Sequence, residues 1–96
     1  MELENLLKTR REQILTTARS HGAYDVPVFG SAARGEARPD SDVDFLVKPE
    51  AGRSLLDLAR LLRELQALLD CNVDVVTEAG LRPRIRPQVL EEARPI

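Results

Sequence analysis

The sequence predicts one small domain of the α+β class, for three reasons. A chain of 96 residues is long enough for one core and little more. A hydrophobic fraction of 43% beside 31% charged residues is typical of a globular chain. Segments with helical period alternate with short apolar runs of strand period. We therefore treat residues 1–96 as a single domain with no internal boundary.

The chain opens with a predicted amphipathic helix. Its apolar residues share one helical stripe, and they are Leu3, Leu6, Leu7, Ile14, Leu15 and Ala18. His21-Gly22 fits the end of this helix, because glycine suits the left-handed conformation that often follows one. We expect His21, the only histidine, to be an exposed residue of the last turn and not a catalytic base.

A short strand and a helical turn are predicted next. Val26 to Phe29 has strand character, and Pro27 suits a strand start or an edge position. Ser31 to Arg34 favours one or two helical turns, which Gly35 closes.

The second strand is predicted after a polar connection, Glu36 to Ser41, in which Pro39-Asp40 provides turn chemistry. This strand runs from Asp42 to Lys48. Its alternation places Val43, Phe45 and Val47 on one face, and Asp42, Asp44 and Leu46 on the other.

Two more helices and a third strand complete the prediction. Ser54, with Asp57 three residues later, resembles a capping box before a leucine-rich helix. Val73 to Thr77 is the third strand, with Asp74 between two valines, and Pro87 can open a last helix that ends at Ala93. The apolar residues of the leucine-rich helix are Leu55, Leu58, Ala59, Leu61, Leu62, Leu65, Leu68 and Leu69.

The residues that carry chemistry are a Gly-Ser pair and three strand aspartates. Two carboxylates one residue apart on a strand share a face, with their Cα atoms about 6.5–7 Å apart. Such a pair is unfavourable unless something positive lies between the partners, and a divalent metal ion is the usual solution. Mg²⁺ takes few carboxylates together with substrate phosphates, and two such ions can clamp an in-line displacement at phosphorus. The residues concerned are Gly30, Ser31, Asp42, Asp44 and Asp74.

Competing motifs fail on particular residues. Gly30 to Gly35 has the spacing of a phosphate-binding P-loop, but Glu36-Ala37 stands where Lys and Ser or Thr are required. Asp40, Asp42 and Asp44 have the first spacings of a calcium loop, but its later Gly and Glu positions hold other residues. Any one of the aspartates alone suits a solvated strand face, and only the set predicts a metal site.

Each of two further polar residues allows two interpretations. Arg34 suits either neutralisation of phosphate charge or an ordinary surface position. Ser41 suits either a turn, which we favour, or a phosphate contact.

Composition excludes several classes of function. A net charge of −2, a pI near 5.4 and 3% aromatic residues argue against a direct nucleic-acid partner. Cys71 is the only cysteine, so an internal disulfide and a cysteine-rich zinc site are excluded, and we expect it to be a buried small hydrophobe. The sequence has neither an apolar signal core nor a run of about 18 apolar residues. We therefore expect a cytoplasmic protein with no membrane association.

The string FGSAARGEARPDSDVDFLV resembles the DNA polymerase β-like nucleotidyltransferase superfamily, in which Gly-Ser, ten residues and Asp-x-Asp recur. It is most similar to the minimal nucleotidyltransferases, or MNT domains, of bacteria and archaea, and the similarity extends to the later VDVVT strand. The resemblance implies a small mixed β-sheet with helices packed on one side. By position, Asp42 and Asp44 match the metal-binding pair, and Asp74 matches the third acid, which binds metal and takes the proton of the attacking hydroxyl. Gly30 and Ser31 match the nucleotide-phosphate loop, and Arg34 matches the arginine of the Arg-Gly pair after it.

The resemblance also implies an activity. Family members transfer a nucleoside monophosphate, here AMP from ATP, to a hydroxyl group with the help of Mg²⁺, and release pyrophosphate. Minimal members pair with an all-helical HEPN protein as a toxin–antitoxin system, in which the MNT protein is the antitoxin and attaches AMP to the HEPN ribonuclease. Two alternatives stay open: an antitoxin that inhibits by contact while only binding nucleotide, and a transfer subunit for a small-molecule acceptor. Because these 96 residues leave no room for the template-binding parts of a polymerase, we do not expect a templated polymerase.

Overall fold

The computed structural model describes residues 3–36 and 42–96. Within these ranges the chain forms, in order, α1 (Leu3–Thr9), α2 (Arg11–Ser20), β1 (Val28–Phe29), β2 (Val43–Val47), α3 (Leu55–Leu69), β3 (Val73–Thr77) and α4 (Arg86–Glu92). The predicted turn at Pro39-Asp40 and the predicted role of Ser41 lie outside the described residues.

The described strands form a mixed sheet in the order β1-β2-β3. β1 runs antiparallel to β2, whereas β2 and β3 are parallel. A parallel pair needs a long crossover connection, and the 15-residue helix α3 provides it. The edge strand β1 begins at Val28, later than the predicted start at Val26, so Pro27 lies just before it. The Pro27 carbonyl accepts a hydrogen bond from the Leu46 N–H at 2.8 Å.

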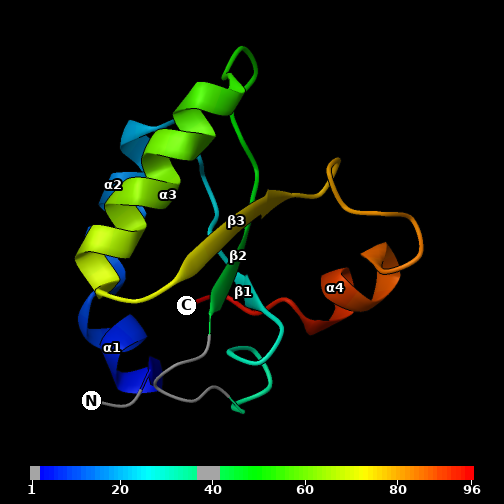
Figure 1. The fold of residues 1–96 in the computed structure, drawn as a ribbon, viewed down its shortest axis with the longest axis horizontal. Helices are drawn as coiled ribbons and strands as arrows, with labels where there is room; N and C mark the ends of the chain where they lie inside the picture. Colours follow the sequence, from blue (N-terminus) through cyan, green and yellow to red (C-terminus); the bar gives the residue numbers. More distant parts are fainter. Residues whose placement is uncertain (1–2, 37–41) are drawn as a thin grey trace.

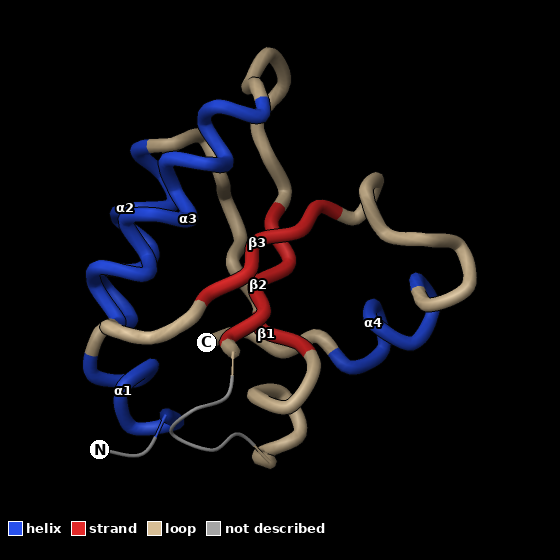
Figure 2. Tube along the Cα trace, in the orientation of Figure 1, coloured by secondary structure: helices blue, strands red, loops and turns tan. Residues whose placement is uncertain are grey.

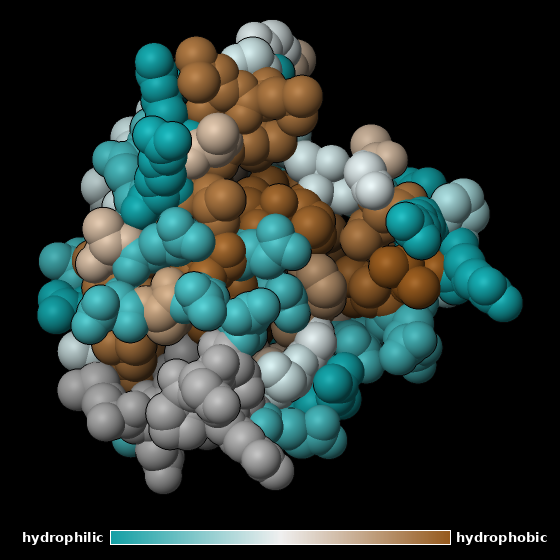
Figure 3. Space-filling view, viewed as in Figure 1, coloured by the Kyte–Doolittle hydropathy of each residue, from teal (hydrophilic) through white to brown (hydrophobic). Residues whose placement is uncertain are grey.

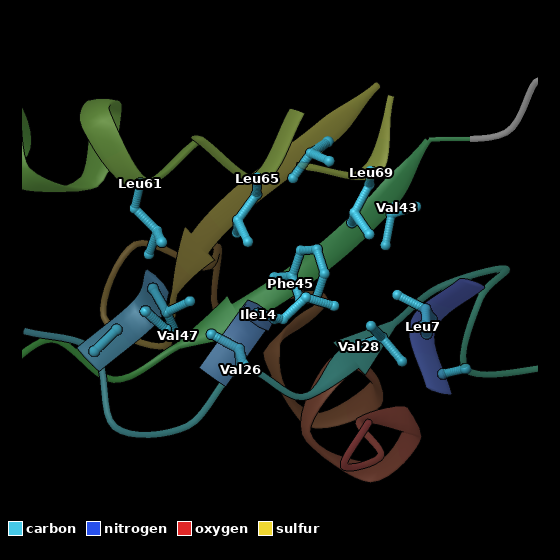
Figure 4. Close-up of a cluster of buried hydrophobic side chains, with 14 residues drawn as sticks. Leu7, Ile14, Val26, Val28, Val43, Phe45, Val47, Leu61, Leu65 and Leu69 are labelled. Atoms are coloured by element: carbon cyan, nitrogen blue, oxygen red, sulfur yellow. The ribbon is translucent and has the colours of Figure 1, made fainter. Parts of the chain in front are cut away.

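The core lies on one face of this sheet. Val43, Phe45 and Val47 of β2 are fully buried there, and in Figure 4 Phe45 stands among side chains of the neighbouring helices. Alternation along β2 turns Asp44 and Leu46 to the opposite face. The predicted division of β2 into two faces is therefore confirmed. The helix residues buried in the core include Leu7, Ile14, Ala18, Leu61, Leu65 and Leu69.

The helices are arranged unevenly around the sheet. Figures 1 and 2 show α1, α2 and α3 gathered on one side of the sheet, which is the predicted helical layer, while α4 lies apart, beyond β1. The predicted N-terminal helix is divided in two, because Arg10 leaves helical geometry at φ −97° and ψ 5°. Both pieces still bury the predicted stripe, since Leu7, Ile14 and Ala18 are all buried.

The start of α3 follows the predicted capping pattern. The Asp57 carboxylate accepts hydrogen bonds from the Ser54 N–H at 3.0 Å and from the Ser54 hydroxyl at 3.3 Å. These bonds, the backbone one first, lower the pKa of Asp57. At the other end Asp70 adopts a left-handed conformation with φ 51° and ends the helix.

No helix in the described ranges is long and apolar enough to cross a membrane.

Candidate active site

Two of the predicted aspartates face each other across neighbouring strands. Asp44 of β2 is the register partner of Asp74 of β3, and adjacent strands lie about 4.8 Å apart. Asp44 is half-buried, and burial is the main cause that raises its pKa, followed by the charges of Asp74 and Asp42. The charges of both Asp74 and Asp42 therefore act on the carboxylate of Asp44.

The outer two aspartates are more accessible to solvent. Asp42 lies just before β2, and both Asp42 and Asp74 are exposed. The Asp74 Oδ1 accepts a hydrogen bond from the Val75 N–H at 3.0 Å. Within residues 3–36 and 42–96, no three potential ligand side chains are already grouped closely enough to hold a metal ion.

The donor set nevertheless fits magnesium. All three candidate ligands are hard carboxylate oxygens, and Mg²⁺ is commonly bound by one or two carboxylates together with substrate phosphates. Asp44 and Asp74 are anchored on paired backbones, while the exposed side chains of Asp42 and Asp74 can rotate toward a shared ion. The site is thus fixed in its backbone and adjustable in its side chains.

Gly30 brings the predicted phosphate loop directly against Asp44. Phe29 is the register partner of Asp44, so the chain leaves β1 beside this carboxylate. Gly30 has φ +68°, and a Cβ atom added to it would lie 2.8 Å from the Asp44 Oδ2. Both the backbone conformation and the close approach therefore require glycine.

The loop then makes one compact turn. The Arg34 N–H donates to the Gly30 carbonyl at 3.1 Å, and the Glu36 N–H donates to the Ser31 carbonyl at 2.9 Å. Ser31 is half-buried in this turn, and Ala33 anchors the turn to the core. The predicted helical turn is thus confirmed as a single turn, and Gly35 follows it at φ +71°.

Arg34 is held between two acidic side chains. Its Nε donates to Glu36 and its Nη1 donates to Glu92, each at 3.0 Å. These hydrogen bonds raise the pKa of Arg34. The Glu92 contact was missed by sequence reasoning, because the partners are 58 residues apart and belong to no shared motif.

Contacts at both of its ends hold helix α4 in place. The Arg86 side chain donates to Glu78, after β3, at 3.0 Å. Beyond the helix, Arg94 exchanges two backbone hydrogen bonds with Val28 of β1, at 2.8 and 2.9 Å. Val89 is buried. The C-terminal part of the chain therefore borders the site.

The remaining polar candidates stand apart from the aspartates. His21 pairs with Glu64 of α3, and 17% of its side chain is exposed, so the predicted exposed position is wrong. Its partner is 43 residues away, and nothing local indicates it. Cys71 is half-buried and packs against the core, and its pKa is raised first by burial. It therefore packs as the predicted small hydrophobe, but it is only half-buried where burial was predicted.

A pocket of about 340 Å³ opens elsewhere, between α2, the segment before β1 and the end of the chain. Leu15 and Leu46 contribute apolar surface to it, and Arg11 and Lys48 contribute positive charge. None of the three predicted aspartates lines this pocket.

Comparison with known proteins shows one consistent likeness. The profile of the nucleotidyltransferase domain family matches residues 11–96. The protein adenylyltransferase MntA of Thermococcus cleftensis is 40% identical over 91 residues, which are 95% of this chain and 89% of that protein. A candidate protein adenylyltransferase of Methanocaldococcus jannaschii is 40% identical over 83 residues, covering 86% of this chain and 89% of the relative.

Solved structures give the same likeness. A candidate minimal nucleotidyltransferase is 57% identical, with a TM-score of 0.88 over 100% of this chain and 97% of that one. A toxin–antitoxin complex with AMP-PNP contains a chain that is 22% identical, with a TM-score of 0.74 over 88% of this chain and 69% of the other. This second likeness is one of fold alone.

Proposed function

The chain belongs to the nucleotidyltransferase domain family, and from this premise we propose that it transfers AMP from ATP to a hydroxyl group of a partner protein. One observation in the structure carries the proposal. The carboxylate of Asp44 lies against Gly30 of the phosphate loop and beside its register partner Asp74. Metal-binding acids and a phosphate-holding turn thus occupy one place.

The reaction uses these residues in distinct roles. The acceptor hydroxyl oxygen forms a bond to the α-phosphorus of ATP while the bond from that phosphorus to the oxygen bridging to the β-phosphate breaks, and pyrophosphate leaves. Asp74, the exposed third acid, takes the hydroxyl proton. Gly30 and Ser31 position the phosphates through their backbone N–H groups and hydroxyl, and Arg34 offsets phosphate charge. Bound magnesium, for which Asp42, Asp44 and Asp74 are the ligands, supplies further charge neutralisation.

A protein acceptor is supported by the relatives at 40% identity, which are named as protein adenylyltransferases. Apolar side chains on the surface support it too. Leu55 and Leu56 at the start of α3 are 84% and 59% exposed, and Ile85 and Leu90 near or on α4 are 44% and 42% exposed. Figure 3 shows apolar surface over both places. Exposed apolar surface of this kind is typical of a protein-binding face.

We propose that the partner is a helical toxin of the HEPN type and that this chain is its antitoxin. Two structural relatives come from toxin–antitoxin complexes, one with AMP-PNP and one named MntA-HpeT. Attachment of AMP to a toxin adds bulk and negative charge, which is a direct way to block a ribonuclease surface.

Intact-mass measurement tests this function. The full chain is incubated with MgCl₂, ATP and a HEPN-type partner protein, beside a sample with the Asp42→Asn variant and a sample with the partner alone. We expect the mass of AMP on the partner only with the unmodified chain. Partner neutralisation without added mass, retained by Asp42→Asn, would instead establish inhibition by contact. In a parallel sample that also contains an aminoglycoside, AMP on the aminoglycoside and not on the partner would establish a small-molecule acceptor.

A further inference from the structure

The carboxylate of Glu92 already contacts the groups that the phosphate loop offers to an anion. Glu92 accepts a hydrogen bond from Arg34 Nη1 at 3.0 Å and another from Gln88 Nε2 at 3.4 Å. The backbone N–H of Gly30 also lies near enough to this carboxylate to lower its pKa, although by less than Arg34 does. The Glu92 side chain is only 21% exposed, although it lies near the end of a short helix.

These contacts keep Glu92 ionised. Hydrogen bonds to a carboxylate favour its charged form, and those from Arg34 and Gln88 lower the pKa of Glu92, with a smaller effect of the nearby Gly30 N–H. A full negative charge therefore lies beside the Gly-Ser turn at neutral pH. A carboxylate oxygen and a phosphate oxygen use the same kinds of donor, namely backbone N–H groups and guanidinium.

We propose that Glu92 is an internal substitute for phosphate, which holds Arg34 in position beside the Gly30 N–H and leaves both groups free when the triphosphate of ATP binds. This inference rests on the proposed function, because that function assigns Gly30 and Arg34 to the nucleotide. Glu92 is a positioning residue in this account. It keeps the loop ordered, and it lowers the affinity for ATP because its charge must be moved away from the donors.

The exchange would also link ATP binding to α4. The start of α4 is attached to the end of β3 by Arg86 and Glu78, and the chain after it is attached to β1 by Arg94 and Val28. The Arg34–Glu92 pair attaches its last turn to the phosphate loop. Loss of this one contact would free the last turn while the other attachments remain.

Glu36 provides a matched control. It pairs with the same guanidinium at the same 3.0 Å distance, but its side chain is 65% exposed. Glu36→Gln and Glu92→Gln therefore remove the same charge from the same arginine. Only the Glu92 carboxylate also lies near the backbone N–H of Gly30.

Calorimetric titration of the full chain with ATP and Mg²⁺ tests the proposal. We expect Glu92→Gln to lower the dissociation constant about 5- to 10-fold, since it removes a nearby like charge. The gain should shrink in high salt, and Glu36→Gln should change affinity far less. Unchanged or weaker binding by Glu92→Gln, or an equal gain in Glu36→Gln, would overturn the proposal.

A second measurement uses the unmodified protein, so it does not depend on whether a variant folds. In the unmodified protein, the side-chain carboxyl ¹³C resonance of Glu92 should shift when ATP is added, together with the amide resonance of Gly30. A shift at Gly30 without one at Glu92 would overturn the exchange and leave the proposed function intact. Failure of the unmodified chain to bind ATP at all would contradict the proposed function itself.

Discussion

The two faces of β2 show how a small domain divides stability from chemistry within one strand. Phe45 and its alternate neighbours point into the core and are fully buried. Asp44, one residue away, points to the opposite face, where burial and two other carboxylates raise its pKa. Burial of apolar side chains on the core face stabilises the folded state. On the other face, partial burial disfavours the ionised form of the Asp44 carboxylate. Adjacent residues of one strand should therefore respond to substitution in opposite ways.

The largest effect is expected from a substitution on the face of β2 that carries Asp44, which we call the chemical face. Asp44→Asn should lower AMP transfer about a thousandfold, because the loss of a metal ligand removes several kcal/mol of stabilisation from the transition state. Rates of labelled AMP transfer at saturating ATP measure this effect. Asp70→Asn is the matched control, since it makes the same change at the left-handed end of α3, and asparagine tolerates that conformation. Equal activity of the two variants would remove Asp44 from the site.

The next effect is expected on the core face. Phe45 is fully buried at the centre of the core, so Phe45→Ala should lower the free energy of unfolding by about 3–5 kcal/mol. Urea unfolding followed by circular dichroism measures the change. Phe45→Leu should cost clearly less, because it leaves a smaller cavity. A loss below about 1 kcal/mol for Phe45→Ala would show that this core is not close-packed.

A pair of glycines tests whether the phosphate loop must approach Asp44 closely. Gly30 and Gly35 have nearly the same positive φ, 68° and 71°. An alanine at either position should cost about 1–2 kcal/mol of backbone strain. Only at Gly30 would the added Cβ meet Asp44, since nothing lies within 4 Å at Gly35. We expect both variants to lose stability, measured by thermal melting, and only Gly30→Ala to lose most of its ATP affinity. Similar affinities would contradict a role for the contact.

The sequence predicted features that depend on residues close together in the chain better than features that depend on distant residues. The bounds of α3 and β3 were predicted correctly, because leucine spacing, the Ser54–Asp57 cap and valine alternation are local signals. Strand period predicted that Asp44 and Asp74 would share a sheet face if their strands were neighbours, but the register that aligns them is visible only in the structure. The polymerase β-like nucleotidyltransferase fold that the motif implied is confirmed by the structural relative with a TM-score of 0.88.

The contacts that escaped prediction join distant segments. The His21–Glu64 pair and the Arg34–Glu92 pair span 43 and 58 residues. Such contacts depend on how the helices pack against the rest of the fold. The spacing of apolar residues in the sequence does not indicate which distant segments come together. The break at Arg10 escaped as well, because neither glycine nor proline marks it.

The smallest effect concerns stability on the chemical face. The folded state raises the pKa of Asp44, so its ionisation opposes folding as pH rises from the unfolded to the folded pKa. In metal-free buffer at pH 7, Asp44→Asn should therefore melt roughly 1–5 °C higher than the unmodified chain. Well below the ordinary aspartate pKa of about 3.9, the carboxyl is protonated in both states, and the difference should vanish. A lower melting temperature for Asp44→Asn at pH 7 would contradict the electrostatic account.

The central claim is that Asp42, Asp44 and Asp74 bind metal where the Gly30–Ser31 turn holds the phosphates of the nucleotide. Crystals of the full chain grown with Mn²⁺ and AMP-PNP, measured for anomalous scattering by manganese, test it most directly. The account predicts a manganese peak bound by Asp42 and Asp44, with phosphate oxygens on the Gly30–Ser31 turn. Manganese far from these aspartates, or phosphates in the Arg11–Lys48 pocket, would contradict it.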